Sequence, residues 1–122
     1  MRHKRFATCA GVIVVAMLLA ACGGGSGAPS GRAITIKALD IKYDTTTLSA
    51  KVGETLTVTL ENDGALEHSF VIDELNVKIE HVQPGQKGSA TFTLSSPGTY
   101  TYYCDVPGHR QAKMAGTLTV NP

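Results

Sequence analysis

Apolar and polar side chains alternate along most of the chain beyond about residue 33. The clearest example is TLTVTLEN, in which Leu56, Val58 and Leu60 are separated by threonines. A period of two is typical of a β-strand with one buried face. The alternation recurs in ATFTLSS and GTLTV, and with one shift of parity near Ala38 in ITIKALDIKY. We therefore expect strands over most of this region.

Turn residues occupy the segments between these stretches. KVGE, NDGAL, QPGQKG and SPGTY contain the glycine, proline and asparagine that tight turns favour. No stretch has a convincing helical period, and neither an internal repeat nor a second domain is visible. About seven short strands in roughly 90 residues predict an all-β fold, an antiparallel β-sandwich.

The first part of the chain has a different character. Three basic residues within residues 1–5 precede the apolar run FATCAGVIVVAMLLAA, which ends at Cys22. This order is typical of a bacterial secretory signal, and the run is marginal for a permanent span, which needs about 20 apolar residues. The exit LAAC resembles the lipobox of bacterial lipoproteins. We expect a signal peptide over residues 1–21 and lipidation of Cys22; the alternative is an uncleaved anchor in which Cys22 has no role.

A flexible linker is expected over residues 22–31, because GGGSGAPSG has nothing to bury. Nine such residues reach about 15–18 Å. The folded domain would then cover residues 32–122, with eight basic and ten acidic side chains and a formal charge of −2. Nothing in this balance suggests nucleic-acid binding, which needs a basic surface. We expect a monomeric domain outside the cytoplasm, held to a membrane by its lipid.

Cysteine usage points to a bound ion. Cys9 would leave with the signal and Cys22 would carry lipid, so Cys104 stands alone in an exported domain, where cysteines usually pair. A domain of this size without a disulfide has a small core, and an ion could supply part of its stability. The lone thiol is therefore a candidate metal ligand.

Three further residues could share a site with this thiol. His68 begins the stretch HSFVID on the same face as Phe70, and Cys104 ends TYTYYC on the face of the alternate tyrosines, so both should point inward. His109 and Met114 follow on the loop before the last strand. At one end of a sandwich these residues could form a pocket with one thiolate, two imidazoles and one thioether.

The donor set favours copper. A thiolate, two imidazoles and a distant thioether suit both Cu(I) and Cu(II), as in blue-copper sites. Structural zinc usually takes four cysteine or histidine ligands, and iron–sulfur clusters need several cysteines. Taken singly, each of the four could be an ordinary core residue; their coincidence favours a metal site.

The segments EHSFVI and YYCDVPGHRQAKMAGTLTV resemble those of the cupredoxins, the plastocyanin, azurin and auracyanin family of type 1 copper proteins. The resemblance implies a Greek-key sandwich of seven to eight strands, one type 1 copper cycling between Cu(I) and Cu(II), and one-electron transfer without catalysis. It implies His68, Cys104, His109 and Met114 as ligands. Family members often carry asparagine after the first histidine, whereas this chain has Ser69.

The resemblance also implies redox-protein partners that dock on an apolar patch around His109, formed by Val106 and Pro107 with Ala65 and Leu66. Other functions stay open. A protein that binds or delivers copper for an extracytoplasmic oxidase would use the same fold, although the chain lacks a Met- and His-rich arm.

A nitrite reductase needs further copper sites or domains, and a metal-free adhesion domain would leave Cys104 unexplained. His81 shares parity with Ile79 in VKIEHV and could replace His68, although no ligand motif surrounds it.

Overall fold

The computed structural model describes residues 31–122. The predicted signal peptide, the lipidation of Cys22 and most of the linker lie outside this part of the chain. The described residues form nine strands and one short 3₁₀ turn. The strands are β1 (Gly31–Leu39), β2 (Lys42–Tyr43), β3 (Thr47–Lys51), β4 (Thr55–Asn62), β5 (His68–Ile72), β6 (Val77–Val82), β7 (Lys87–Thr93), β8 (Gly98–Tyr103) and β9 (Ala115–Asn121), and the turn η1 is Asp73–Leu75.

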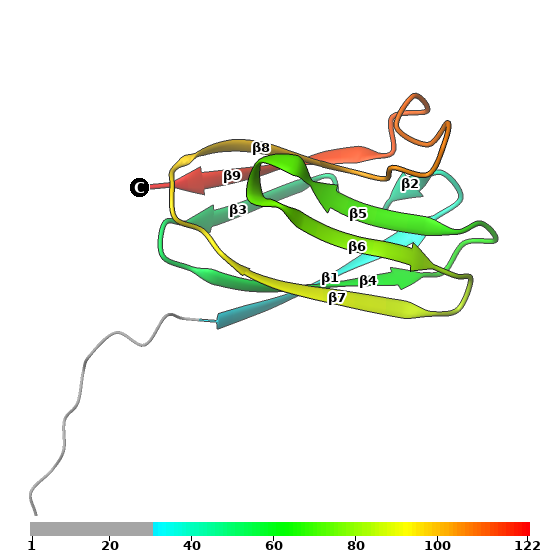
Figure 1. The fold of residues 1–122 in the computed structure, drawn as a ribbon, viewed down its shortest axis with the longest axis horizontal. Coiled ribbons are helices and arrows are strands. Elements are labelled where there is room, and N and C mark those ends of the chain that lie inside the picture. Colours follow the sequence, from blue (N-terminus) through cyan, green and yellow to red (C-terminus); the bar gives the residue numbers. More distant parts are fainter. Residues whose placement is uncertain (1–30) are drawn as a thin grey trace, which may run out of the picture.

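The strands form two sheets that face each other (Figure 1). One sheet has the order β2-β1-β4-β7 and the other the order β3-β9-β8-β5-β6. The predicted all-β sandwich is confirmed, with nine strands. Pairing is mixed rather than wholly antiparallel, because β1 pairs with β4 and β3 with β9 in parallel. Alternation in a sequence reports which face of a strand is buried and says nothing about the direction of its neighbour.

One predicted strand is interrupted by a tight turn. The side chains of Ile36 and Ala38 are buried in phase, and the chain then reverses so that Ala38 pairs with Tyr43 in β2. Ile41 lies in this turn with φ 53° and 37% exposure. The shift of parity near Ala38 therefore marks a hairpin turn, and Ile41 within it is a surface residue.

Three aromatic rings occupy the core between the sheets. The Tyr102 ring stacks on Phe70 at 5.1 Å and lies 5.7 Å from Tyr43. Both buried tyrosines keep their hydroxyls bonded: Tyr102 donates to the Thr45 carbonyl at 2.7 Å and Tyr43 donates to the Ser69 carbonyl at 2.6 Å. A buried hydroxyl needs such an acceptor. The second bond fixes the backbone directly beside His68.

The end of the sandwich that carries the loop between β8 and β9 also carries β2 and the loop between β4 and β5 (Figure 1). Strand β1 starts at the opposite end of the sandwich, the end at which β9 finishes in the other sheet (Figure 1). Within residues 31–122, no helix has the length and apolar character needed to cross a membrane.

Candidate metal centre

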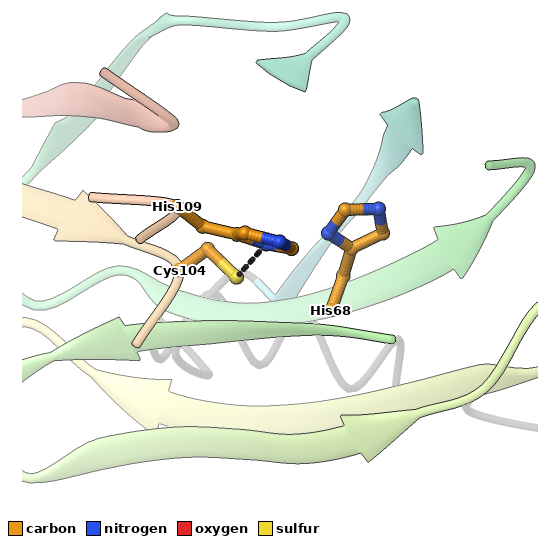
Figure 2. Close-up of side chains that lie close together, drawn as sticks. All are labelled: His68, Cys104 and His109. Atoms are coloured by element: carbon orange, nitrogen blue, oxygen red, sulfur yellow. Dashed lines mark hydrogen bonds between the residues drawn. The ribbon is translucent and has the colours of Figure 1, made fainter. Parts of the chain in front are cut away.

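Three of the four predicted ligands converge at the loop end of the sandwich. His68 opens β5, Cys104 directly follows β8, and His109 lies in the loop before β9. One donor atom from each lies within 4.8 Å of the other two, and the Cys104 Sγ and His109 Nδ1 atoms are 3.4 Å apart. Figure 2 shows the three side chains pointing toward one another. Cys104 and His68 are completely buried, and His109 is 7% exposed.

His68 has an unusual environment for a buried histidine. Both ring nitrogens, Nδ1 and Nε2, are buried, and neither makes a hydrogen bond of normal geometry; the backbone of Leu39 offers the ring only a weak interaction. Burial, reinforced by the neighbouring His109, lowers the pKa of His68 below its usual range. The ring is therefore neutral near pH 7 and presents an unshared lone pair, which is the form that binds a metal ion. An unsatisfied buried polar group is costly unless a ligand completes it.

Met114, the fourth predicted ligand, is held beside the other three by its backbone. Its side chain is fully buried, its N–H donates to the His109 carbonyl at 3.0 Å, and its carbonyl accepts from the Cys104 N–H at 3.1 Å. Further turns within the loop use Gly108 at φ 88° and Lys113 at φ 66°. The loop is thus closed on itself by backbone hydrogen bonds, which hold the predicted ligands in one arrangement.

Ser69, the second residue of β5, contacts the Cys104 sulfur. Its backbone N–H donates to Cys104 Sγ at 3.4 Å, and its hydroxyl lies 3.6 Å from the same sulfur. The hydroxyl also donates to Asp105 Oδ1 at 2.5 Å and accepts from the Asp105 N–H at 2.9 Å. The serine that replaces the family's frequent asparagine therefore still links the two ligand segments.

Asn62 is a supporting residue that the sequence analysis missed. It is 1% exposed, and its side-chain amide donates to the carbonyls of Leu66 and Val82 and accepts from the Gly64 N–H. These bonds shape the loop that leads into His68. The sequence did indicate its burial, because Asn62 follows Leu56, Val58 and Leu60 at the alternate positions of β4 that point inward.

His81 takes no part in the centre. It sits outward in a β-bulge, where two residues of β6 face one of β5, with φ 54° and its Nδ1 2.9 Å from Glu67 Oε1. This hydrogen bond, with the carboxylate charge, raises the pKa of His81. The bulge reverses the parity on which the alternative to His68 depended.

Several exposed apolar residues lie in the loops at the end of the sandwich that carries the centre (Figure 1). Leu66 is 45% exposed, and Ala65 next to it donates its N–H to Asp40 beside the exposed Ile41. Pro107 is exposed and Val106 is half-buried on the other side of the loop. The residues expected to form an apolar patch are thus exposed or half-buried, and Ile41 is a further exposed apolar residue. That they gather around His109 stays a prediction.

The residues fit a copper ion. They offer one sulfur, two imidazoles and a thioether, all buried, and one imidazole makes no hydrogen bond of normal geometry. Soft sulfur donors combined with imidazole select copper over hard cations. Cys104 is the single cysteine within residues 31–122 and is in no disulfide, so its sulfur is available.

The chain belongs to the cupredoxins, because the family model for the cupredoxin-like domain matches residues 10–120. It is 29% identical to auracyanin-A of Chloroflexus aurantiacus over 88% of this chain and 91% of that protein. A shorter match, 58% identity over 38 residues, links it to auracyanin-B of the same organism and spans 16% of that protein's length.

Two other relatives broaden the comparison. A solved structure of dithionite-reduced auracyanin from Roseiflexus castenholzii superimposes with a TM-score of 0.69 at 26% identity, covering 76% of this chain and 99% of that one. The copper-resistant cuproprotein CopI of Pseudomonas aeruginosa is 23% identical over 78% of this chain and 79% of its own length.

We expect the feature of His68 that suits it to bind a metal, a buried imidazole without normal hydrogen bonds, to destabilise the metal-free protein. We expect His68→Leu to stabilise the metal-free protein by about 1 kcal/mol, because it removes two buried polar atoms without normal hydrogen bonds. Urea unfolding of both proteins in the presence of a chelator measures this. His81→Leu is the matched control and should bring no gain, since His81 is exposed and bonded to Glu67. A metal-free His68→Leu protein that is less stable than the parent would contradict the interpretation.

Proposed function

We propose that this protein is a one-electron carrier that holds a single type 1 copper ion through His68, Cys104, His109 and Met114. The observation that carries the proposal is the buried convergence of one thiol and two imidazoles, one of them without a hydrogen bond of normal geometry. Cysteine, histidine and methionine together are the ligand set of blue-copper electron-transfer sites.

A bound copper ion supplies a Cu(I)/Cu(II) couple. The protein's contribution is rigidity: the loop from Cys104 to Met114 is tied by backbone bonds at both ends, and β5 fixes His68 in the sheet. A site that cannot rearrange keeps the same donors in both oxidation states, which lowers the cost of electron exchange. Burial of the sulfur and of His68 excludes water from the donors.

Redox proteins are the partners that this arrangement favours. His109 is the most exposed of the four proposed ligands, and the exposed Leu66 and Ile41 lie at the same end of the molecule. A small apolar patch around a ligand allows a brief docking contact that brings a partner close to the metal. Weak redox complexes characteristically use small interfaces.

The relatives support two versions of a copper function. An auracyanin that dithionite reduces is consistent with electron transfer. The similarity to CopI, described as a copper-resistant cuproprotein, is the observation that favours the second candidate, a protein that binds or delivers copper. An electron carrier exchanges electrons reversibly and keeps its copper ion, whereas a delivery protein releases the ion.

Copper binding is tested on the soluble form that starts at Gly23. We expect added Cu(II) to produce an intense visible thiolate-to-copper band that bleaches on reduction and returns on oxidation, with no loss of metal. Cys104→Ser should abolish the band, because the thiolate is its source. A colourless protein that binds Cu(I) tightly would reject electron transfer and support delivery; a protein without copper affinity would reject both.

Substitution of Met114 tests its role as the axial ligand. Met114→Gln provides a harder oxygen donor, which favours Cu(II), so we expect a lower reduction potential. Met114→Leu removes the donor and should raise the potential. A tenfold change in relative affinity for the two oxidation states corresponds to about 59 mV for one electron. Identical potentials in all three proteins would contradict the assignment.

We further propose that residues 1–21 are a signal peptide, that Cys22 carries lipid, and that residues 32–122 act as a tethered cupredoxin domain. The basic start, the apolar run and LAAC support this, as does the linker that follows. Such a protein would work outside the cytoplasm at a membrane surface.

Lipidation predicts where the protein is found after cell fractionation. In a bacterial host that processes lipoproteins, the full chain should sediment with membranes, and Cys22→Ser should shift most of it to the soluble extracytoplasmic fraction. Cys9→Ser is the control and should leave the distribution unchanged. Equal membrane retention of both variants would contradict a lipid on Cys22.

A further inference from the structure

A chain of polar contacts connects the surface to the sulfur of Cys104. Lys78 Nζ of β6 lies 3.0 Å from Asp105 Oδ2, and the other oxygen of Asp105 accepts from the Ser69 hydroxyl at 2.5 Å. Ser69 in turn touches Cys104 Sγ through its N–H at 3.4 Å and its hydroxyl at 3.6 Å. Lys78 on β6 is thus linked to the Cys104 sulfur through two intervening residues, Asp105 and Ser69.

Ser69 is held in place, so its hydroxyl can donate its one proton either to Asp105 Oδ1 or to Cys104 Sγ. The residue is 1% exposed, and its carbonyl accepts from the buried Tyr43 hydroxyl. A serine hydroxyl carries one proton, and the carboxylate of Asp105 is both closer and the stronger acceptor. The sulfur therefore keeps the backbone N–H of Ser69 and competes with Asp105 for the hydroxyl proton.

Lys78 balances the charge that Asp105 brings to this position. A carboxylate directly after a metal-binding thiolate adds negative charge beside it, which favours the more positive oxidation state of a bound ion. Lys78 contacts Asp105 and also Glu80, at 2.5 Å. All three line a hollow of about 150 Å³ together with Glu67 and His81. In that hollow Lys78 pairs with two carboxylates, while Glu67 is bonded to His81.

We propose that Lys78 and Asp105 are positioning residues that set the electron density on the Cys104 sulfur, acting through Ser69. Asp105 withholds the Ser69 proton from the sulfur and adds negative charge; Lys78 offsets that charge. The pair thereby sets the balance between Cu(I) and Cu(II) without touching the ion. This inference rests on the proposed copper function. It adds that charged side chains at the protein surface influence the reduction potential of the bound copper.

The test compares Lys78→Gln, Asp105→Asn and the double variant as copper-loaded proteins. Lys78→Gln should shift the equilibrium toward Cu(II) by roughly two- to fivefold, the effect of one partly exposed charge. Asp105→Asn should shift it toward Cu(I) by at least as much, because it removes a charge and releases the Ser69 hydroxyl to the sulfur. The double variant should lie between the two.

Reduction potential is the main readout, and the energy of the thiolate-to-copper band is the second, because it reports the electron density on sulfur. Lys78→Arg should restore the parent values. Lys87→Gln is the matched control: it removes the same charge from an ion pair with Glu61 on the other sheet and should change neither readout. Urea unfolding of the metal-free proteins verifies that each variant folds.

Shifts of opposite sign for the two single variants would support the proposal. Shifts of the same sign, or potentials equal to the parent, would overturn it while the copper function stands, since a merely structural pair would loosen the site in one direction. If the parent protein itself shows no thiolate-to-copper band, the copper function falls and this inference falls with it.

Discussion

The structure depends on one constraint: histidine and cysteine donors are buried among apolar side chains. One of these donors, His68, makes no hydrogen bond of normal geometry. His68 contributes two nitrogens without normal hydrogen bonds to the interior, where such groups destabilise the metal-free fold. Loop residues alone could not hold such a group against water. The core of the sandwich holds it because His68 is the first residue of a strand whose five side chains are all buried. Binding of an ion and stability of the fold are therefore coupled.

The supporting contacts show how a small sandwich keeps this arrangement. Tyr43 reaches from β2 to the Ser69 carbonyl, and Asn62 shapes the loop that leads into His68. The loop after β8 is closed by backbone bonds from Met114 to Cys104 and to His109. These partners come from different strands, so the geometry at the loop end reflects the whole fold. A ligand shell oriented in this way is as important for tuning a metal as the ligands themselves.

Much of the fold and the candidate centre could be predicted from the sequence, because burial leaves a period of two in every long strand. The inward positions of His68 and Cys104 followed from that parity. Parity failed at His81, where a left-handed residue in a bulge reverses the face, and it shifted in ITIKALDIKY, where Ile41 is a left-handed residue in a turn. The parallel pairings and the contacts of Ser69 with Asp105 depend on which strands become neighbours, and alternation within one strand carries no such information.

Strand β1 runs from one end of the sandwich to the end that carries the proposed ligands. Gly31 pairs with Thr55 at one end, and Ala38 pairs with Asn62 near His68 at the other, a separation of about 23 Å along the strand. The preceding residues therefore join the domain far from the His109 surface. The tether and the docking face proposed above would therefore use opposite ends of the domain.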